Sequence, residues 1–173
     1  MPNFEQQNLH KKFLNKKFKM IKLILLFIFA LKSINCEQNV YNMPLELCSD
    51  SPMTGFTRTG YCIANEHDQG SHFVCATVTA DFLEYSKSMG NDLSTPHPPY
   101  FPGLKPGDNW CLCVYRWIQA KRNGRQPPVV LQSTNFRTLE FLRNFNLTLE
   151  DLETSTNFDQ NLSAGVTNSK REL

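Results

Sequence analysis

The sequence predicts a small α+β domain that combines short strands, about three helices and a long loop rich in proline and glycine. A length of 173 residues suits one domain rather than two full-sized ones. β-Forming residues dominate the run 71–78, whereas apolar residues recur at three- and four-residue steps after Thr79 and after Asp108. The 13 Phe and the 40% hydrophobic content exclude a disordered chain, and six Cys are too few for a disulfide-dense mini-protein.

The first strand and the first helix are expected to follow each other directly. Residues 71–78 alternate between two faces and are mostly apolar, which is typical of a buried strand. Thr79 is placed to cap a helix that has Asp81 in its first turn and Gly90 just past its end. The expected apolar face of this helix consists of Phe82, Tyr85, Ser86 and Met89.

The segment from Gly90 to Asp108 contains five prolines and three glycines, which exclude a regular element. Loops of this length inside a domain are usually functional or disordered. Because apolar residues are embedded in the segment, we expect an ordered loop that its own side chains pack. These apolar residues are Leu93, Tyr100, Phe101 and Leu104.

A second helix is expected from a cap at Asp108 to about Arg122, with Gly124 as its stop. Trp110 and Trp117 would lie along one apolar stripe of this helix.

The remainder of the domain is expected to hold a short strand and a third helix. Pro127–Leu131 predicts the strand, and Asn135 is placed to cap the helix. Beyond residue 154 the chain is rich in Ser, Thr and Asn, which predicts a flexible tail. The apolar positions of the third helix would be Thr138, Leu139, Phe141 and Leu142.

The first 36 residues have the pattern of a secretory signal peptide. Lysines precede the apolar run Leu23–Leu31, which is shorter than the about 20 residues that span a bilayer. Met20 is a possible true start, and cleavage is expected after Cys36. The mature chain would then consist of one globular domain, 37–153, and a flexible tail, 154–173, without a membrane span.

The other end of the chain resembles the Lys-Asp-Glu-Leu signal that returns proteins to the endoplasmic reticulum, with Arg in place of Asp. We therefore expect a soluble protein of the endoplasmic reticulum lumen that a retention receptor binds, or a secreted protein if the signal is weak. Asn146 and Asn161 lie in glycosylation sequons. The tetrapeptide consists of Lys170, Arg171, Glu172 and Leu173.

The charge of the mature chain argues against nucleic acid as a partner. Residues 37–173 contain eleven basic and fifteen acidic residues, so their net charge is −4. A mildly acidic body has no electrostatic reason to bind DNA or anionic lipid.

Five cysteines remain after Cys36: Cys48, Cys62, Cys75, Cys111 and Cys113. In an oxidising compartment an odd number predicts at least one unpaired thiol or an intermolecular bond. The sequence leaves all fifteen ways of forming two disulfides from five cysteines open.

Two groups of residues are candidates for catalysis. Cys111 would lie in the first turn of the expected second helix, where the helix dipole lowers the pKa of a thiol, whereas Cys113 would belong to the core. Cys75, His72 and Asp68 form the second group, because a thiolate nucleophile needs a base and the base needs an orienting carboxylate. Within one strand His72 and Cys75 point to opposite faces, so a dyad would need a partner from another element.

No metal site is predicted, and the sequence leaves the cofactor open. Cys62 and His72 are conceivable zinc ligands, but the paired Cys-x2-Cys spacing of common zinc sites is absent. A phosphate-binding Gly-rich loop, a Gly-x-Ser-x-Gly elbow and a His-Glu-x-x-His helix are absent as well. These absences argue against the commonest nucleotide-binding, ester-cleaving and peptide-cleaving classes.

The polar residues of the long loop suggest a rim around a small ligand, or they only shape the loop through turns and caps. We predict a binding domain for a small ligand or peptide. The alternative is a thiol-dependent enzyme or oxidoreductase that uses a free cysteine, so enzymatic activity stays open. The candidate ligand-binding residues are Asn91, Asp92, His97, Asp108, Trp110 and Trp117.

Several consecutive strings resemble the family known as domain of unknown function 2237, over roughly Asn39 to Leu152. The resemblance implies a single domain and assigns no activity, cofactor or partner. The strings that carry it include Pro52–Phe56, His72–Ala76, Gly90–Pro96, Phe101–Leu104 and Trp110–Cys113.

Overall fold

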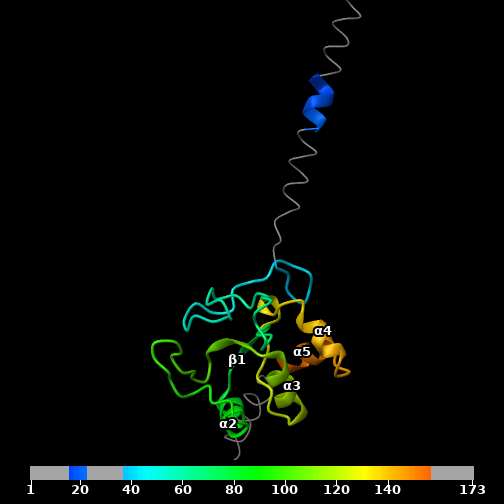
Figure 1. The fold of residues 1–173 in the computed structure, drawn as a ribbon. Helices are drawn as coiled ribbons and strands as arrows, with labels where there is room; N and C mark the ends of the chain where they lie inside the picture. The colour runs from blue at the N-terminus through cyan, green and yellow to red at the C-terminus, as the bar shows by residue number, and fades with distance from the viewer. Residues whose placement is uncertain (1–15, 23–36, 157–173) are drawn as a thin grey trace, which may run out of the picture. The chain divides into compact units, whose positions relative to one another are not determined.

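The computed structural model describes residues 16–22 and 37–156. The chain divides into two units, Met1–Cys36 and Glu37–Leu173, and in the first unit residues 16–22 are helical. The second unit contains all of the elements named below (Figure 1). The apolar run Leu23–Leu31, the Cys36 cleavage position and the whole segment 157–173 lie outside the described residues. Within the described part, no helix has the length and apolar character needed to cross a membrane.

An antiparallel pair of strands lies at the centre of the domain. β1 (Val74–Thr77) pairs with β2 (Asn109–Leu112), and in this register Cys75 lies opposite Cys111. The predicted strand at Pro127–Leu131 runs along the other edge of β1, where Val129 forms an isolated bridge to Ala76. Because proline has no N–H to donate, this proline-led segment adds single bonds rather than a full ladder.

Helix α2 (Ala80–Ser88) follows β1 as predicted. The Thr79 hydroxyl accepts a hydrogen bond from the Phe82 N–H at 3.1 Å, and Gly90 follows the C-cap residue Met89. Phe82 and Ser86 are buried, as expected, but Met89 is exposed and Leu83 is buried instead. The buried face of α2 is therefore rotated slightly from the predicted one.

The predicted helix from Asp108 to Arg122 is wrong in its first part. Residues Asn109–Leu112 form β2, and helix α3 (Val114–Arg122) begins only after Cys113, its N-cap residue. The short apolar run before α3 fits both the helical and the extended pattern, and pairing with β1 decides for the strand. Asp108 closes a turn instead, because its Oδ2 accepts the Lys105 N–H at 2.8 Å.

The C-terminal part of the domain contains η1 (Leu131–Ser133), α4 (Thr138–Arg143) and α5 (Leu149–Thr156). The N-cap residue of α4 is Arg137 rather than Asn135. Asn135 forms the preceding turn, in which its Oδ1 accepts the Arg137 N–H at 3.0 Å. Helix α5 was not among the predicted elements, and it reaches Thr156, beyond the expected domain end at 153.

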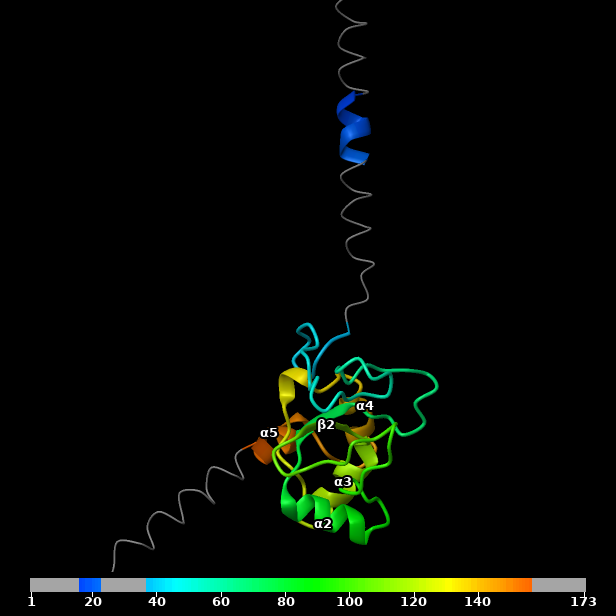
Figure 2. The ribbon, with the colours of Figure 1, turned by 90° about the vertical axis from the view of Figure 1, so that its left-hand side faces the viewer.

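The main core fills the space between the sheet and the helices. Trp117, Phe82, Leu142 and Leu152 are among its largest fully buried side chains. Two perpendicular views show the same order along the domain: the coiled segment 37–70 at one end, the sheet in the middle and α2 at the other end (Figures 1 and 2). The fold is therefore α+β, with five described helices in this unit when η1 is counted and one two-stranded sheet.

Candidate functional site

A cavity of about 480 Å³ lies between the turn at residues 55–58, the long loop and strand β2. Five of the predicted candidate residues line it, although they came from two different hypotheses. Three further lining residues, Phe56, Arg58 and Phe101, were not among the candidates. The predicted residues that meet here are His72, Asp92, His97, Trp110 and Cys111.

The long loop is ordered, as predicted, and its polar residues hold it in shape. Asp92 accepts the backbone N–H groups of Ser94 and Thr95, and its Oδ2 lies 3.0 Å from the Lys87 ammonium. Lys87, followed by the Thr95 hydroxyl and the two backbone N–H groups, holds the pKa of Asp92 well below its usual range. A side chain at Gly103 would collide with backbone atoms of the loop itself, and its φ of +75° favours glycine.

His72 is held in place by Asp68, as the sequence suggested for this pair. The His72 Nδ1 lies 2.7 Å from Asp68 Oδ1, and the His72 N–H donates to Asp68 Oδ2 at 2.7 Å. The Asp68 side chain is only 1% exposed, whereas that of His72 is 38% exposed. A Cβ at Gly70 would overlap the imidazole, so only glycine leaves room for this ring position. His72 thus presents an oriented ring to the cavity.

Arg58 lines the cavity but was not among the predicted candidates. Its guanidinium lies 5.0 Å from the centre of the Trp110 ring, and its Nη1 donates to the Gly55 carbonyl at 2.9 Å. Phe101 packs edge-on against the same tryptophan at 5.5 Å. Within the described residues no ion pair includes Arg58. The cavity therefore contains a fixed cation that has no carboxylate as counterion.

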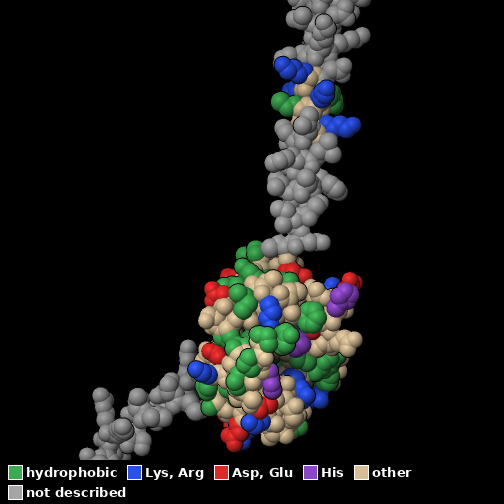
Figure 3. All heavy atoms as spheres, turned by 60° about the vertical axis from the view of Figure 1, so that its left-hand side comes forward, with side chains coloured by type: hydrophobic (Ala, Val, Ile, Leu, Met, Phe, Trp, Pro, Cys, Tyr) green, Lys and Arg blue, Asp and Glu red, His purple; other side chains and the backbone are tan. Residues whose placement is uncertain are grey.

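A second, larger cavity of about 910 Å³ adjoins the first, because Phe56 and Arg58 line both. Asp108 lines this second cavity, together with Lys105 and the largely exposed Tyr100. Histidine, basic and hydrophobic side chains lie side by side on one face of the molecule (Figure 3).

Two of the predicted ligand-binding residues are placed elsewhere. The Asn91 side chain donates to the Ser86 hydroxyl at 3.0 Å, which fastens the loop to α2. Trp117 is fully buried, and its Nε1 donates to the Pro127 carbonyl at 3.3 Å. Neither residue lines either cavity: Asn91 holds the loop against α2, and Trp117 belongs to the core.

The structure corrects the proposal of Cys75 or Cys111 as a free nucleophile. Cys48 is bonded to Cys75 and Cys62 to Cys111, so neither candidate carries a titratable thiol. Cys113 is the free cysteine of the described part, and it is half-buried at the start of α3 rather than in the core. The two disulfides and one free thiol account for the odd number of cysteines after Cys36.

The conceivable zinc pair Cys62 and His72 is engaged in other interactions, a disulfide for Cys62 and the Asp68 carboxylate for His72. Asn146 is exposed in the turn between α4 and α5. Asn161 and the retention residues Lys170–Leu173 lie outside the described residues.

Comparison with known proteins identifies a family. The sequence model of a family described as uncharacterised protein conserved in bacteria (DUF2237) matches residues 38–153. No curated protein matches the chain. The matched range covers every element from β1 to α4 and both cavities.

Proposed function

Because the chain belongs to the DUF2237 family, whose description assigns no activity, we propose a function from the cavity of this chain: the domain binds a small anionic ligand there. The observation that carries this proposal is the Arg58 guanidinium stacked on Trp110, which forms no ion pair with a carboxylate of residues 16–22 or 37–156. A guanidinium offers several N–H donors in a plane and recognises carboxylates and phosphates.

The other groups of the cavity support an anion with an apolar part. His72 and His97 add ring nitrogens, while Phe101 and Trp110 form an aromatic wall. Lys87 already compensates the charge of Asp92, so this carboxylate opposes an incoming anion only weakly. A volume of about 480 Å³ lies within the usual range of small-molecule pockets.

The adjoining cavity extends the site for a longer ligand. Met53, Phe56 and Tyr100 line it with exposed apolar surface. Apolar surface next to a cation suits an aromatic carboxylate or the C-terminal residues of a peptide. This agrees with the expectation of a small-ligand or peptide binding domain.

The test compares a charged and an uncharged aromatic probe on the full chain. Benzoate and phenyl phosphate are titrated while tryptophan fluorescence is followed, since Trp110 lines the cavity. We expect both anions to bind and benzyl alcohol, which has no charge, to bind much more weakly. Equal binding of the alcohol, or no binding of either anion, would contradict the proposal.

Variants locate the binding in the cavity. Arg58→Asn removes the cation, and Asn tolerates the φ of +55° at this position. We expect at least about a tenfold loss of affinity for benzoate, which corresponds to about 1.4 kcal/mol. Arg125→Asn is the matched control, because Arg125 is an exposed arginine that pairs with Asp81. The control variant should bind like the wild type.

The alternative function is thiol–disulfide exchange, and one observation favours it: Cys111 and His72 line the same cavity. A thiolate from a small thiol would attack the Cys111 sulfur and form a mixed disulfide, while Cys62 leaves as a thiolate and takes up a proton. Incubation with glutathione, followed by mass analysis, tests this step. Adducts on Cys111 that His72→Gln slows would support exchange, and an unmodified disulfide would exclude it.

We infer that the protein works in the lumen of the endoplasmic reticulum. The two disulfides are compatible with an oxidising compartment, and the lysines, the apolar run and the final tetrapeptide have the pattern of a signal peptide and a retention signal. Deletion of Lys170–Leu173 is expected to release the protein into the medium of secreting cells. Retention of the truncated chain at the wild-type level would contradict a receptor that binds this tail.

A further inference from the structure

Four buried cysteines from three segments of the chain meet on one side of the sheet. Cys48 and Cys62 come from the coiled segment 37–70, Cys75 from β1 and Cys111 from β2. None of them is more than 5% exposed, and they form a cluster separate from the main core. This group lies outside the proposed anion site, apart from the contact of Cys111 with the cavity.

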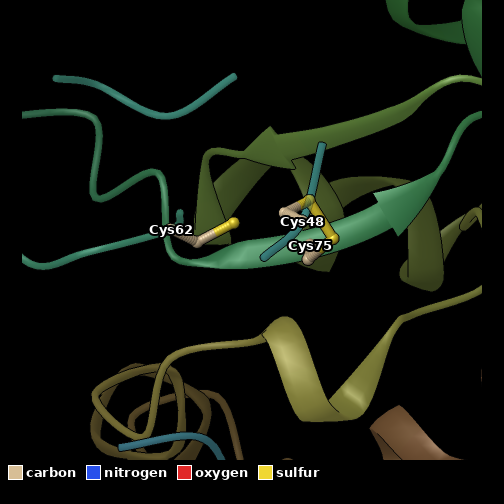
Figure 4. Close-up of side chains that lie close together, drawn as sticks. All are labelled: Cys48, Cys62 and Cys75. Atoms are coloured by element: carbon tan, nitrogen blue, oxygen red, sulfur yellow. A yellow bond between two sulfur atoms is a disulfide. The ribbon is translucent and has the colours of Figure 1, made fainter. Parts of the chain in front are cut away.

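The sulfur atoms of this cluster lie closer together than two independent disulfides require. Those of Cys48, Cys62 and Cys75 all lie within 4.8 Å of one another. Figure 4 shows the Cys62 sulfur pointing toward the Cys48–Cys75 disulfide. The fourth sulfur, that of Cys111, is bonded to Cys62. Three of the sulfurs therefore share one small volume, and the fourth is bonded to one of them.

The strand register explains why two of the cysteines adjoin. Cys75 and Cys111 lie directly opposite each other. Their N–H groups donate to the hydroxyls of Thr134 and Thr54, so they form a non-hydrogen-bonded pair. Side chains of such a pair approach more closely than those of the hydrogen-bonded pairs. The sheet itself thus holds two of the four cysteine side chains on neighbouring strands, on the same face.

These distances approach those of a tetrahedral metal site. Zinc binds thiolate sulfur at about 2.3 Å, so the sulfurs of a site with four cysteine ligands lie about 3.8 Å apart. The sulfurs of Cys48, Cys62 and Cys75 already lie within 4.8 Å of one another, and on reduction the sulfurs of each bonded pair, which a disulfide holds about 2.0 Å apart, need to separate by about 1.8 Å to reach this spacing. The four cysteines are buried and would supply all four ligands, which is typical of a structural zinc site rather than a catalytic one.

We propose that the four cysteines bind one zinc ion when both disulfides are reduced. Two equivalents of a dithiol supply four electrons and four protons, which convert the two disulfides into four thiols while each dithiol becomes a cyclic disulfide. Zinc then replaces the four thiol protons, which leave to solvent. The same position of the fold is thereby cross-linked by two disulfides under oxidising conditions and by one metal ion under reducing conditions.

Cobalt titration of the full chain tests the proposal. The protein is reduced with dithiothreitol, desalted without oxygen and titrated with Co²⁺, whose tetrahedral thiolate complexes absorb strongly in the visible range. We expect saturation at one cobalt per chain and loss of the bands on addition of one equivalent of zinc. The oxidised protein should show no bands, because it has no thiolate pair to offer.

Two variants identify the ligands. Cys48→Ser removes one proposed ligand. Loss of a residue that only hydrogen-bonds to a metal ligand lowers metal affinity about 10- to 100-fold, so loss of a ligand itself is expected to weaken cobalt binding by more than this. Cys113→Ser is the matched control, because Cys113 is free and lies outside the cluster. It should bind cobalt like the wild type. Equal binding by Cys48→Ser, or loss of binding in Cys113→Ser, would overturn the proposal.

A second measurement tests the proposal if the chain unfolds on reduction. If the reduced, metal-free chain loses its near-UV circular dichroism, one equivalent of zinc is expected to restore it, because metal binding then supplies folding free energy. A reduced wild-type chain that takes up no metal, or that zinc does not refold, would overturn the proposal.

Discussion

At the residue scale, the buried carboxylate of Asp68 determines how His72 faces the cavity. Its two oxygens accept the N–H groups of Gly70 and His72, and Oδ1 also lies at hydrogen-bond distance from the imidazole Nδ1. In the neutral ring this contact places the proton on Nδ1 and leaves Nε2 as an acceptor. Asp68 is therefore a positioning residue rather than one that touches a ligand.

We expect Asp68→Asn to destabilise the domain by about 1–3 kcal/mol, because the amide cannot accept all three hydrogen bonds and leaves a donor unpaired. Urea unfolding measures this loss, and nitrogen NMR of the ring reports the change of tautomer. Asp50→Asn provides the control, since Asp50 is exposed. An unchanged midpoint in Asp68→Asn would show that the network contributes no stability.

The same residues show what the sequence could predict of the site. The Asp68 and His72 pair was found because a base needs an orienting carboxylate, and His97 and Trp110 were found from the polar loop and the apolar run. Arg58 was missed because only the folded turn brings it over Trp110. Gly55 predicts a turn close to Arg58 in the sequence, but a turn does not indicate which residue the Arg58 side chain contacts.

At the element scale, the long loop and the helices differ in how far local sequence determines them. α2 followed its caps, Thr79 and Gly90, as predicted. The start of α3 was misplaced because Asn109–Leu112 is too short to distinguish the helical from the extended pattern of apolar residues. The strand with which this segment pairs is also distant in sequence. α5 carried a readable signal that was overlooked: the Thr148 N–H donates to Asp151 Oδ2 at 2.8 Å, which is half of a capping box.

The ion pair of Lys87 and Asp92 predicts how the loop responds to acid. Because the pKa of Asp92 in the folded protein lies below its ordinary value of 3.8, the carboxylate contributes stability above that value and loses it as the pH falls further. We expect the amide NMR signals of Ser94 and Thr95 to stay constant from pH 7 to about pH 4 and to shift only below it. Lys87→Met should move this change to higher pH. Identical titrations of both proteins would show that Lys87 is not the cause.

At the scale of the whole molecule, the disulfides attach the coiled segment 37–70 to the sheet. This described segment contains turns and isolated bridges but no helix. Its cysteines are bonded to the two central strands, and its residues Phe56 and Arg58 form one wall of the proposed site. The sequence predicted an odd cysteine but not the partners, because pairing depends on which segments the fold brings together.

Removal of the Cys48–Cys75 bond is therefore expected to weaken both stability and binding. The 27-residue separation predicts a loss of about 3–4 kcal/mol in the chain-entropy description. Urea unfolding of the Cys48→Ala/Cys75→Ala double variant, without reductant, measures the loss. Cys113→Ala is the control and should unfold like the wild type, since Cys113 forms no disulfide.

Hydrogen exchange shows where the stability is lost. In the double variant we expect the amides of residues 48–60 to exchange faster. The exchange rates of the α2 and α3 amides should change only as far as the global free energy of unfolding changes. Benzoate affinity should fall with the loosened wall that holds Arg58. A variant that loses less than about 1 kcal/mol, or whose extra exchange spreads evenly over the helices, would show that the sheet and core hold this segment without the bond.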